Sequence, residues 1–129
     1  MHNGGIAQFH LIKRSLVNKL NDVSFQMMQG NTDSEHCFAL FLTILDKMSP
    51  LEEPCSPTVM RHALVQTIRE INNLCREFQI KEASLLNFAV SDGDTLVASK
   101  FVDIETSNAA SLYFTTGWIS MDKKSKTRK

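Results

Sequence analysis

Apolar residues recur at helical spacing in three stretches of the first half of the chain. Residues 11–20 set apolar side chains against basic and amide ones, a pattern typical of an amphipathic helix of about three turns. A second helix is expected after Thr32. A third is expected after Ser56, which can cap a helix that begins at Pro57, and its apolar stripe runs from Met60 to Phe78.

The start of the second helix carries one acid more than a helix cap requires. Thr32 can accept a backbone N–H as N-cap, and Glu35 stands where a capping-box carboxylate belongs. Asp33 is the additional acid. The helix then places three apolar side chains along one face, namely Phe38, Leu42 and Leu45.

The residues before this helix suggest a ligand-facing position for Asp33. Residues 23–28 predict a short strand that leads to a sharp turn at Gly30. Asp33 would then lie where a strand end meets a helix start, a place where α/β folds expose polar groups to ligands. A purely capping role for Asp33 is the alternative.

The pattern changes to that of strands after Ala83. Residues 84–91 are mostly apolar, as in a strand covered on both faces, and Asp92-Gly93-Asp94 predicts a hairpin turn before a second strand at residues 95–102. A further strand is expected at residues 110–115, and three prolines make residues 49–57 a loop. Helices followed by a meander predict an α+β fold, with a helix pair packed on an antiparallel sheet.

Charge is distributed unevenly along the 129 residues. Five of the 14 basic residues lie in residues 123–129, so residues 1–122 carry nine basic residues against 14 acidic ones. An acidic body argues against a nucleic-acid surface. Residues 122–129 are predicted to be a disordered basic tail; weak contact with an anionic partner and a basic address signal are the alternatives.

The cysteines and the hydropathy exclude several classes of protein. Cys37, Cys55 and Cys75 are odd in number and lack C-x-x-C spacing, which favours reduced thiols in the cytoplasm over disulfides or a zinc site. No apolar run is long enough to span a membrane, and no signal peptide is present. We expect no metal, no cofactor, and no membrane or nucleic-acid partner.

A set of motifs occurs in a fixed order along the chain. The motifs are His2-Asn3-Gly4, Gly30-Asn31-Thr32-Asp33-Ser34-Glu35, residues 86–93, Ala98-Ser99-Lys100 and residues 110–114. Each motif alone is weak, but the ordered set resembles the class II, N-terminal-nucleophile glutamine amidotransferases. The resemblance points to the branch that includes the amidotransferase subunit of the glutathione-degrading complex and the γ-glutamyl hydrolase of ergothioneine synthesis. It covers nearly all of residues 2–121.

The resemblance implies a fold and a chemistry. The family fold is a four-layer αββα sandwich, of which residues 1–121 would form a partial type-2 amidotransferase domain, truncated at both ends. The family hydrolyses or transfers a γ-glutamyl amide through a cysteine thioester. Asn3 and Gly4 would form the oxyanion hole, and Asp33 would bind the α-ammonium group of the substrate. The alternative for Asn3 and Gly4 is a simple turn.

The family's nucleophile is an N-terminal cysteine, upstream of the His-Asn-Gly motif and of an arginine that binds the substrate carboxylate. Neither lies within this sequence, and Cys37, Cys55 and Cys75 lack the free α-amino group that serves as base. We therefore expect an internal fragment that has no activity by itself. The alternative is a catalytically inactive module that binds a partner, either a peptidase subunit or a second copy of the chain. The sequence leaves the donor open among glutamine, glutathione and other γ-glutamyl compounds.

Overall fold

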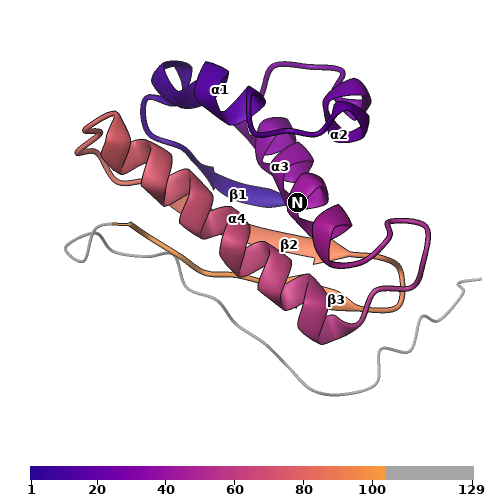
Figure 1. Ribbon diagram of the computed structural model, residues 1–129. Helices are drawn as coiled ribbons and strands as arrows, with labels where there is room; N and C mark the ends of the chain where they lie inside the picture. The colour runs from indigo at the N-terminus through magenta and orange to yellow at the C-terminus, as the bar shows by residue number, and fades with distance from the viewer. Residues whose placement is uncertain (104–129) are drawn as a thin grey trace, which may run out of the picture.

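Two long helices cover one face of a three-stranded antiparallel sheet (Figure 1). The computed structural model describes residues 1–103; the strand expected at residues 110–115 and the tail at 122–129 lie outside that part. The α+β class, with a helix pair packed on an antiparallel sheet, is confirmed. In chain order the elements are β1 (His2–Gly5), α1 (Phe9–Val17), α2 (Asp22–Met27), α3 (Asp33–Met48), α4 (Pro57–Glu77), β2 (Leu85–Ser91) and β3 (Leu96–Ala98).

The sheet joins the two ends of the described chain. Its order is β1-β2-β3, and β1 pairs with β2 so that Asn3 lies opposite Asn87. The predicted hairpin between β2 and β3 is present. The Asp92 carboxylate accepts the backbone N–H groups of Asp94 and Thr95 at 3.0 and 2.7 Å, and Gly93 supplies a φ of +104°.

The second hairpin strand is shorter than expected, because Ser99 interrupts it. After β3, the Ser99 hydroxyl accepts the N–H of Phe88 and donates to the carbonyl of Leu86, both at 3.1 Å, in place of a regular backbone pair. Pairing resumes where Val102 lies opposite Leu85. The hydroxyl thus takes over two backbone hydrogen bonds of β2.

The hydrophobic core lies between the helices and the inner face of the sheet. Figure 1 shows α3 and α4 side by side, with α3 nearer β1 and α4 nearer β3. Ile12, Leu16, Leu40, Ile71 and Leu86 are almost completely buried. These residues come from α1, α3, α4 and β2, so each predicted apolar stripe except that of residues 23–28 contributes to one core.

Two expectations about the helices and one about a strand need correction. Phe38 was expected on the buried face of α3 but is 50% exposed, because the buried face runs through Cys37, Leu40 and Phe41 instead. α1 begins at Phe9 and ends at Val17, before the expected end at residue 20, while α4 begins at Pro57 as predicted. The β2 strand buries only one face well, through Leu86 and Phe88, and not both.

The strand predicted at residues 23–28 is wrong: these residues lie in and just after helix α2. The Asn21 side chain accepts the N–H of Ser24 at 2.9 Å and caps the helix, and Asp22 places its charge in the first turn. Ser24 is the buried residue of α2, whereas Val23, Phe25 and Met27 are each more than half exposed. Capping therefore prevailed over the alternation of apolar and polar residues.

Residues 1–103 lack two kinds of feature. None of the helices there is long and apolar enough to cross a membrane. The same residues hold no group of three or more His, Cys, Asp or Glu side chains placed to bind a metal ion.

Candidate functional site

Asn3 and Gly4 lie in the strand β1, so the interpretation of these residues as a simple turn is wrong. Met1 and Ala89 exchange two backbone hydrogen bonds of 2.7 and 2.9 Å. In an antiparallel ladder hydrogen-bonded and non-hydrogen-bonded pairs alternate, so the pair of Gly4 and Leu86 is non-hydrogen-bonded. The Gly4 N–H consequently points away from β2, toward the edge of the sheet that β1 forms within residues 1–103.

Gly4 occupies a position that only glycine fits. Its φ is +140°, and a Cβ atom added there would lie 2.2 Å from the Leu85 carbonyl oxygen and 2.8 Å from Leu85 Cβ. The close approach of the β1 and β2 backbones thus explains the glycine on structural grounds alone. Because glycine has no side chain, the exposed Gly4 does not shield its own N–H group.

The Asn3 side chain stands on the outer face of the sheet. Asn3 is exposed, and its neighbours His2 and Gly4 pair with the inward-facing Phe88 and Leu86, so Asn3 shares the opposite face with Asn87. The side-chain carbonyl of Asn87 accepts the N–H of Phe101 at 3.2 Å. Asn87 is therefore held in place beside Asn3.

Asp33 lies next to the end of β1, although the strand predicted to lead to it does not exist. One carboxylate oxygen accepts the N–H of Ile6 at 2.9 Å, and the other accepts the N–H of Ser34 at 2.7 Å. The Gly5 Cα also comes close, since a Cβ on it would lie 3.4 Å from the carboxylate. Within residues 1–103 no hydrogen bond joins Asp33 to Asn3 or Gly4.

A histidine and a serine that the sequence analysis did not single out connect the two predicted site segments. His2 Nε2 donates to the carbonyl of Leu85 at 3.0 Å, and in the neutral ring Nδ1 then accepts from the Ser34 hydroxyl at 2.9 Å. His2 precedes Asn3, and Ser34 follows Asp33. The sequence offered one signal for His2 and Ser34: each is the direct neighbour of a predicted site residue.

The predicted capping of α3 is confirmed in part. The Thr32 hydroxyl accepts the N–H of Glu35 at 3.3 Å, as expected. The Glu35 carboxylate, however, accepts the N–H of Gln29 instead of that of Thr32. This bond and the N–H of Gly30 lower the pKa of Glu35. Glu35 therefore fixes the loop that precedes α3.

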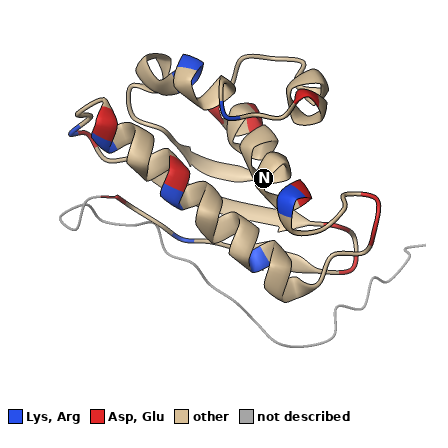
Figure 2. Ribbon diagram, in the orientation of Figure 1, with Lys and Arg blue, Asp and Glu red and all other residues tan. Residues whose placement is uncertain are grey.

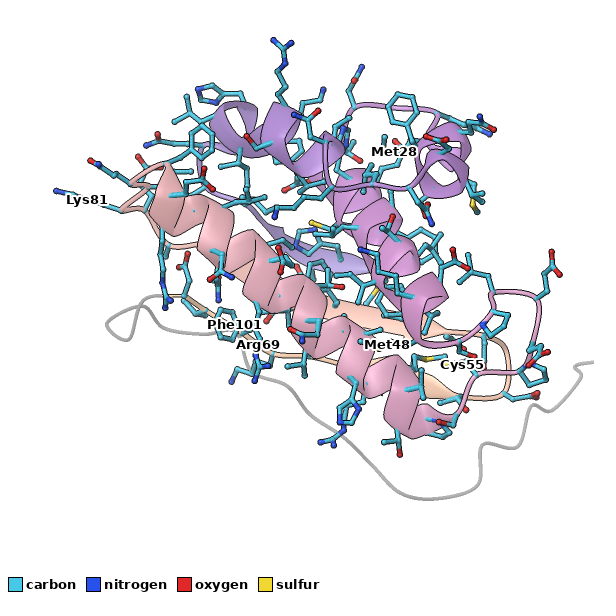
Figure 3. All side chains as sticks on the ribbon, in the orientation of Figure 1. Met28, Met48, Cys55, Arg69, Lys81 and Phe101 are labelled. Carbon is cyan, nitrogen blue, oxygen red and sulfur yellow. The ribbon has the colours of Figure 1, made fainter. Side chains whose placement is uncertain are left out.

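Two of the three cysteines are unsuited to nucleophilic attack. Cys37 and Cys75 are buried free thiols, and burial raises the pKa of both. Cys55 is a free, half-buried thiol in the loop between α3 and α4, labelled in Figure 3. The burial of Cys37 and Cys75 is typical of structural cysteines.

A cavity of about 370 Å³ opens on the helix side of the sheet, next to His2 and Ser34. Its walls include Cys37, Phe41 and Phe88. Asn3, Gly4 and Asp33 are not among the lining residues. A ligand bound by the predicted residues would therefore lie along the edge of β1 and outside this cavity.

Comparison with known proteins shows what this chain is similar to. The chain is 44% identical over 125 residues to the Saccharomyces cerevisiae protein named "Probable glutamine amidotransferase DUG3", in a match that covers 91% of this chain. The resemblance to glutamine amidotransferases is confirmed. A glutamine aminotransferase class-II domain protein from Silicibacter pomeroyi has a similar structure, with a TM-score of 0.58 and 24% identity over 81% of this chain. That likeness establishes a shared fold. No family model matches the chain.

The amidotransferase match extends over only part of each relative. The chain spans about a third of the yeast relative, 35% of its length, and 43% of the bacterial one. The comparison thus supports the general class of amidotransferase or hydrolase for this segment. The substrate and the individual roles of Asn3, Gly4 and Asp33 are matters for a proposal.

Proposed function

We propose that this segment forms part of the active site of a glutamine amidotransferase or γ-glutamyl hydrolase. The Asn3 side-chain amide and the Gly4 N–H would stabilise the oxyanion, and Asp33 would bind the α-ammonium group. One observation supports this proposal best. The N–H groups of Gly4 and Ile6 point outward from the same edge of the sheet, and the Asp33 carboxylate accepts the hydrogen bond from Ile6. The sheet fixes the Gly4 N–H before substrate arrives, and it places the Asn3 side chain on the adjoining outer face.

The spacing along this edge suits a γ-glutamyl group. Gly4 and Ile6 are two residues apart, which is about 7 Å of extended strand. Standard bond lengths place the amide oxygen and the α-nitrogen of a γ-glutamyl group about 6 Å apart. The Asp33 oxygen that accepts the Ile6 N–H has no other hydrogen-bond partner within residues 1–103, which leaves it a lone pair for an ammonium group.

In the proposed reaction, the thiol of an N-terminal cysteine gives its proton to the α-amino group of the same residue, and the thiolate adds to the γ-carbonyl carbon. The carbonyl electrons move to oxygen, where Asn3 and Gly4 would donate hydrogen bonds. The α-ammonium group of the cysteine then returns the proton to the leaving nitrogen, the C–N bond breaks, and a thioester and a free amine remain. Water or an acceptor amine then cleaves the thioester. Buried Cys37 and Cys75 do not supply the thiolate, so the isolated chain should bind substrate without turning it over. Glutamine, glutathione and related compounds in the cytoplasm, including those of glutathione catabolism, are the proposed substrates.

Binding to the isolated chain tests the role of Asp33. In an NMR titration, L-glutamine and glutathione should shift the amide signals of Gly5 and Ile6, whereas N-acetyl-glutamine, whose α-amino group is blocked, should not. Asp33→Asn should remove these shifts. Asp22→Asn, which changes another aspartate in the first turn of a helix, should preserve them. Equal shifts with the blocked compound would exclude the ammonium role.

Turnover tests the oxyanion hole in an enzyme that joins this segment to an N-terminal cysteine. Asn3→Ala should lower kcat about 10²–10³-fold with little change in KM, because the oxyanion exists only in the transition state and nearby states. Asp33→Asn should chiefly raise KM. An Asn3→Ala enzyme with unchanged kcat would remove Asn3 from the proposed site.

A partner-binding module without catalysis is the second candidate function, and the surface of α2 favours it. Val23, Phe25 and Met27 are 58%, 51% and 55% exposed on this one short helix. Val23 and Met27 are four residues apart and share one side of the helix, and exposed apolar side chains that share a side are typical of interaction sites. A peptidase subunit or a second copy of the chain would be the partner. Loss of a complex after substitution of all three residues by serine, with the Gly5 and Ile6 shifts intact, would separate this function from substrate binding.

A further inference from the structure

A groove of about 490 Å³ lies at the end of the molecule opposite Lys81 in Figure 3, between α3, the α3–α4 loop and the β2–β3 turn. Its floor is apolar, with Phe41, Leu42, Leu45, Met60 and Val90 among the lining residues. Phe38 and Met27, at its margin, are 50% and 55% exposed. Such a floor favours an occupant with large apolar side chains.

The rim of this groove is acidic. Glu52, Glu53, Asp92 and Asp94 all line it, and none of the lining residues is Lys, Arg or His. Figure 2 shows the red of these acids on both loops beside the groove. The backbone N–H groups of Thr95 and Asp94 lower the pKa of Asp92, which stays ionised at neutral pH. An occupant should therefore carry positive charge next to its apolar part.

Residues 118–129 of the same chain have this composition. Trp118, Ile119 and Met121 are followed within a few residues by five basic side chains, those of Lys123, Lys124, Lys126, Arg128 and Lys129. The apolar part matches the floor, and the basic part matches the rim. Unlike an unrelated cationic peptide, this segment is covalently attached and present at a high local concentration.

The chain between the sheet and this segment is long enough to reach the groove. Asp103 is tied to Ser84, whose N–H donates to the Asp103 carboxylate at 2.8 Å. The groove lies at the other end of β2, beside Ser91, which at about 3.3 Å per residue is roughly 23 Å from Ser84. The residues between Asp103 and Trp118 can span up to about 50 Å.

We propose that residues 118–129 dock into this acidic groove of their own chain, with Trp118 on the apolar floor and the basic side chains on the rim. The inference is independent of the proposed catalytic function. The sequence alone predicts a disordered tail at residues 122–129, because no acidic partner for the basic run can be recognised among its neighbours in sequence. The fold brings together the four acids that would provide one. Docking would cover the exposed Phe38 ring and neutralise the rim.

Trp118 is the single tryptophan of the chain, so its fluorescence tests the proposal. In the full chain its emission should be blue-shifted and protected from acrylamide quenching, and 1 M salt should reduce this protection. Glu52→Lys with Glu53→Lys should shift the emission to the red and raise quenching severalfold. Glu77→Lys with Glu82→Lys makes the same charge change on residues that do not line the groove, and should leave the emission unchanged.

Exchanging the charges of the rim and the tail tests whether misfolding causes the red shift of the emission. Adding Lys123→Glu and Lys124→Glu to the Glu52→Lys and Glu53→Lys variant should restore the blue-shifted emission, which loss of the fold would prevent. A Trp118 exposed in the unaltered chain, or one indifferent to Glu52→Lys with Glu53→Lys, would overturn the proposal. Protection that disappears on dilution would overturn it in favour of docking between two copies.

Discussion

At Gly4 a single missing Cβ decides whether β1 can lie against β2. The residue combines a φ of +140° with contact to the Leu85 backbone, so two separate costs oppose any side chain there. The proposed oxyanion donor is the N–H of this same residue. Its backbone therefore serves the sheet and the site together.

Gly4→Ala should destabilise the chain by about 2–4 kcal/mol, since strain in φ and overlap with Leu85 add together. Urea unfolding of the chain measures the change. Gly93→Ala is the matched control: its φ of +104° is also unfavourable, but nothing lies within 4 Å of the added Cβ. The control should cost only about 1 kcal/mol. Equal losses for both variants would mean that the contact with Leu85 is unimportant.

Glu35 should make folding sensitive to acid. Because backbone N–H groups lower its pKa in the folded state, its contribution is fully present above the ordinary carboxyl pKa and is lost as the pH falls through the lowered value. Glu35→Gln should remove this part of the pH dependence of unfolding, between about pH 5 and 3. Glu77→Gln, at the exposed end of α4, serves as control. A variant whose acid unfolding follows that of the original chain would contradict the assignment.

At the scale of elements, α2 shows how a local pattern can mislead. Val23, Phe25 and Met27 alternate with polar residues as strand residues do, yet they are exposed on a helix. Asn21 decides the outcome through its cap and through contacts with α3: its N–H donates to Thr43, and its side-chain amide donates to Asp46. Such long-range bonds are invisible in a single sequence.

The role of Asn21 can be measured directly. Asn21→Ala should cost about 1 kcal/mol by removing the cap, and somewhat more through the lost bond to Asp46. Asn21→Ser keeps a capping hydroxyl while losing the amide donor, so its loss should be smaller. Thermal unfolding gives the comparison. If Asn21→Ser proved as harmful as Asn21→Ala, the cap would not be the dominant contribution.

Contacts between residues distant in sequence also limited the prediction of the candidate site. The predicted cap at Thr32 and the turn at Asp92-Gly93-Asp94 depend on neighbouring residues, and both are confirmed. The contact of Asp33 with Ile6 joins elements that are distant in sequence, and it was not predicted. The ligand-facing position predicted for Asp33 rested on a strand at residues 23–28, which lie in and just after helix α2 instead. The bond between His2 and Ser34 was missed for a related reason, since only the fold brings the two side chains together.

For the whole molecule, the fold class followed from the order of helical and strand patterns, because each pattern reflects the face that an element buries. The resemblance added the family, which composition and periodicity could not supply. Neither the patterns nor the resemblance predicted that β1 forms an edge of the sheet, and the candidate site depends on that edge. That edge results from the pairing of His2 with Phe88, and no local signal in either segment specifies the partner.

The pairing of β1 with β2 also fixes the order of events during synthesis. β1 leaves the ribosome before the helices, but Met1 bonds to Ala89, so the partner of the strand is made about 88 residues later. Until then the strand has no neighbour, and closing so long a loop is entropically costly and slow. The helices can form while the chain grows, whereas the edge that carries Gly4 can form only after β2 has emerged. β1 is thus translated before the helices but can reach its native place only after them.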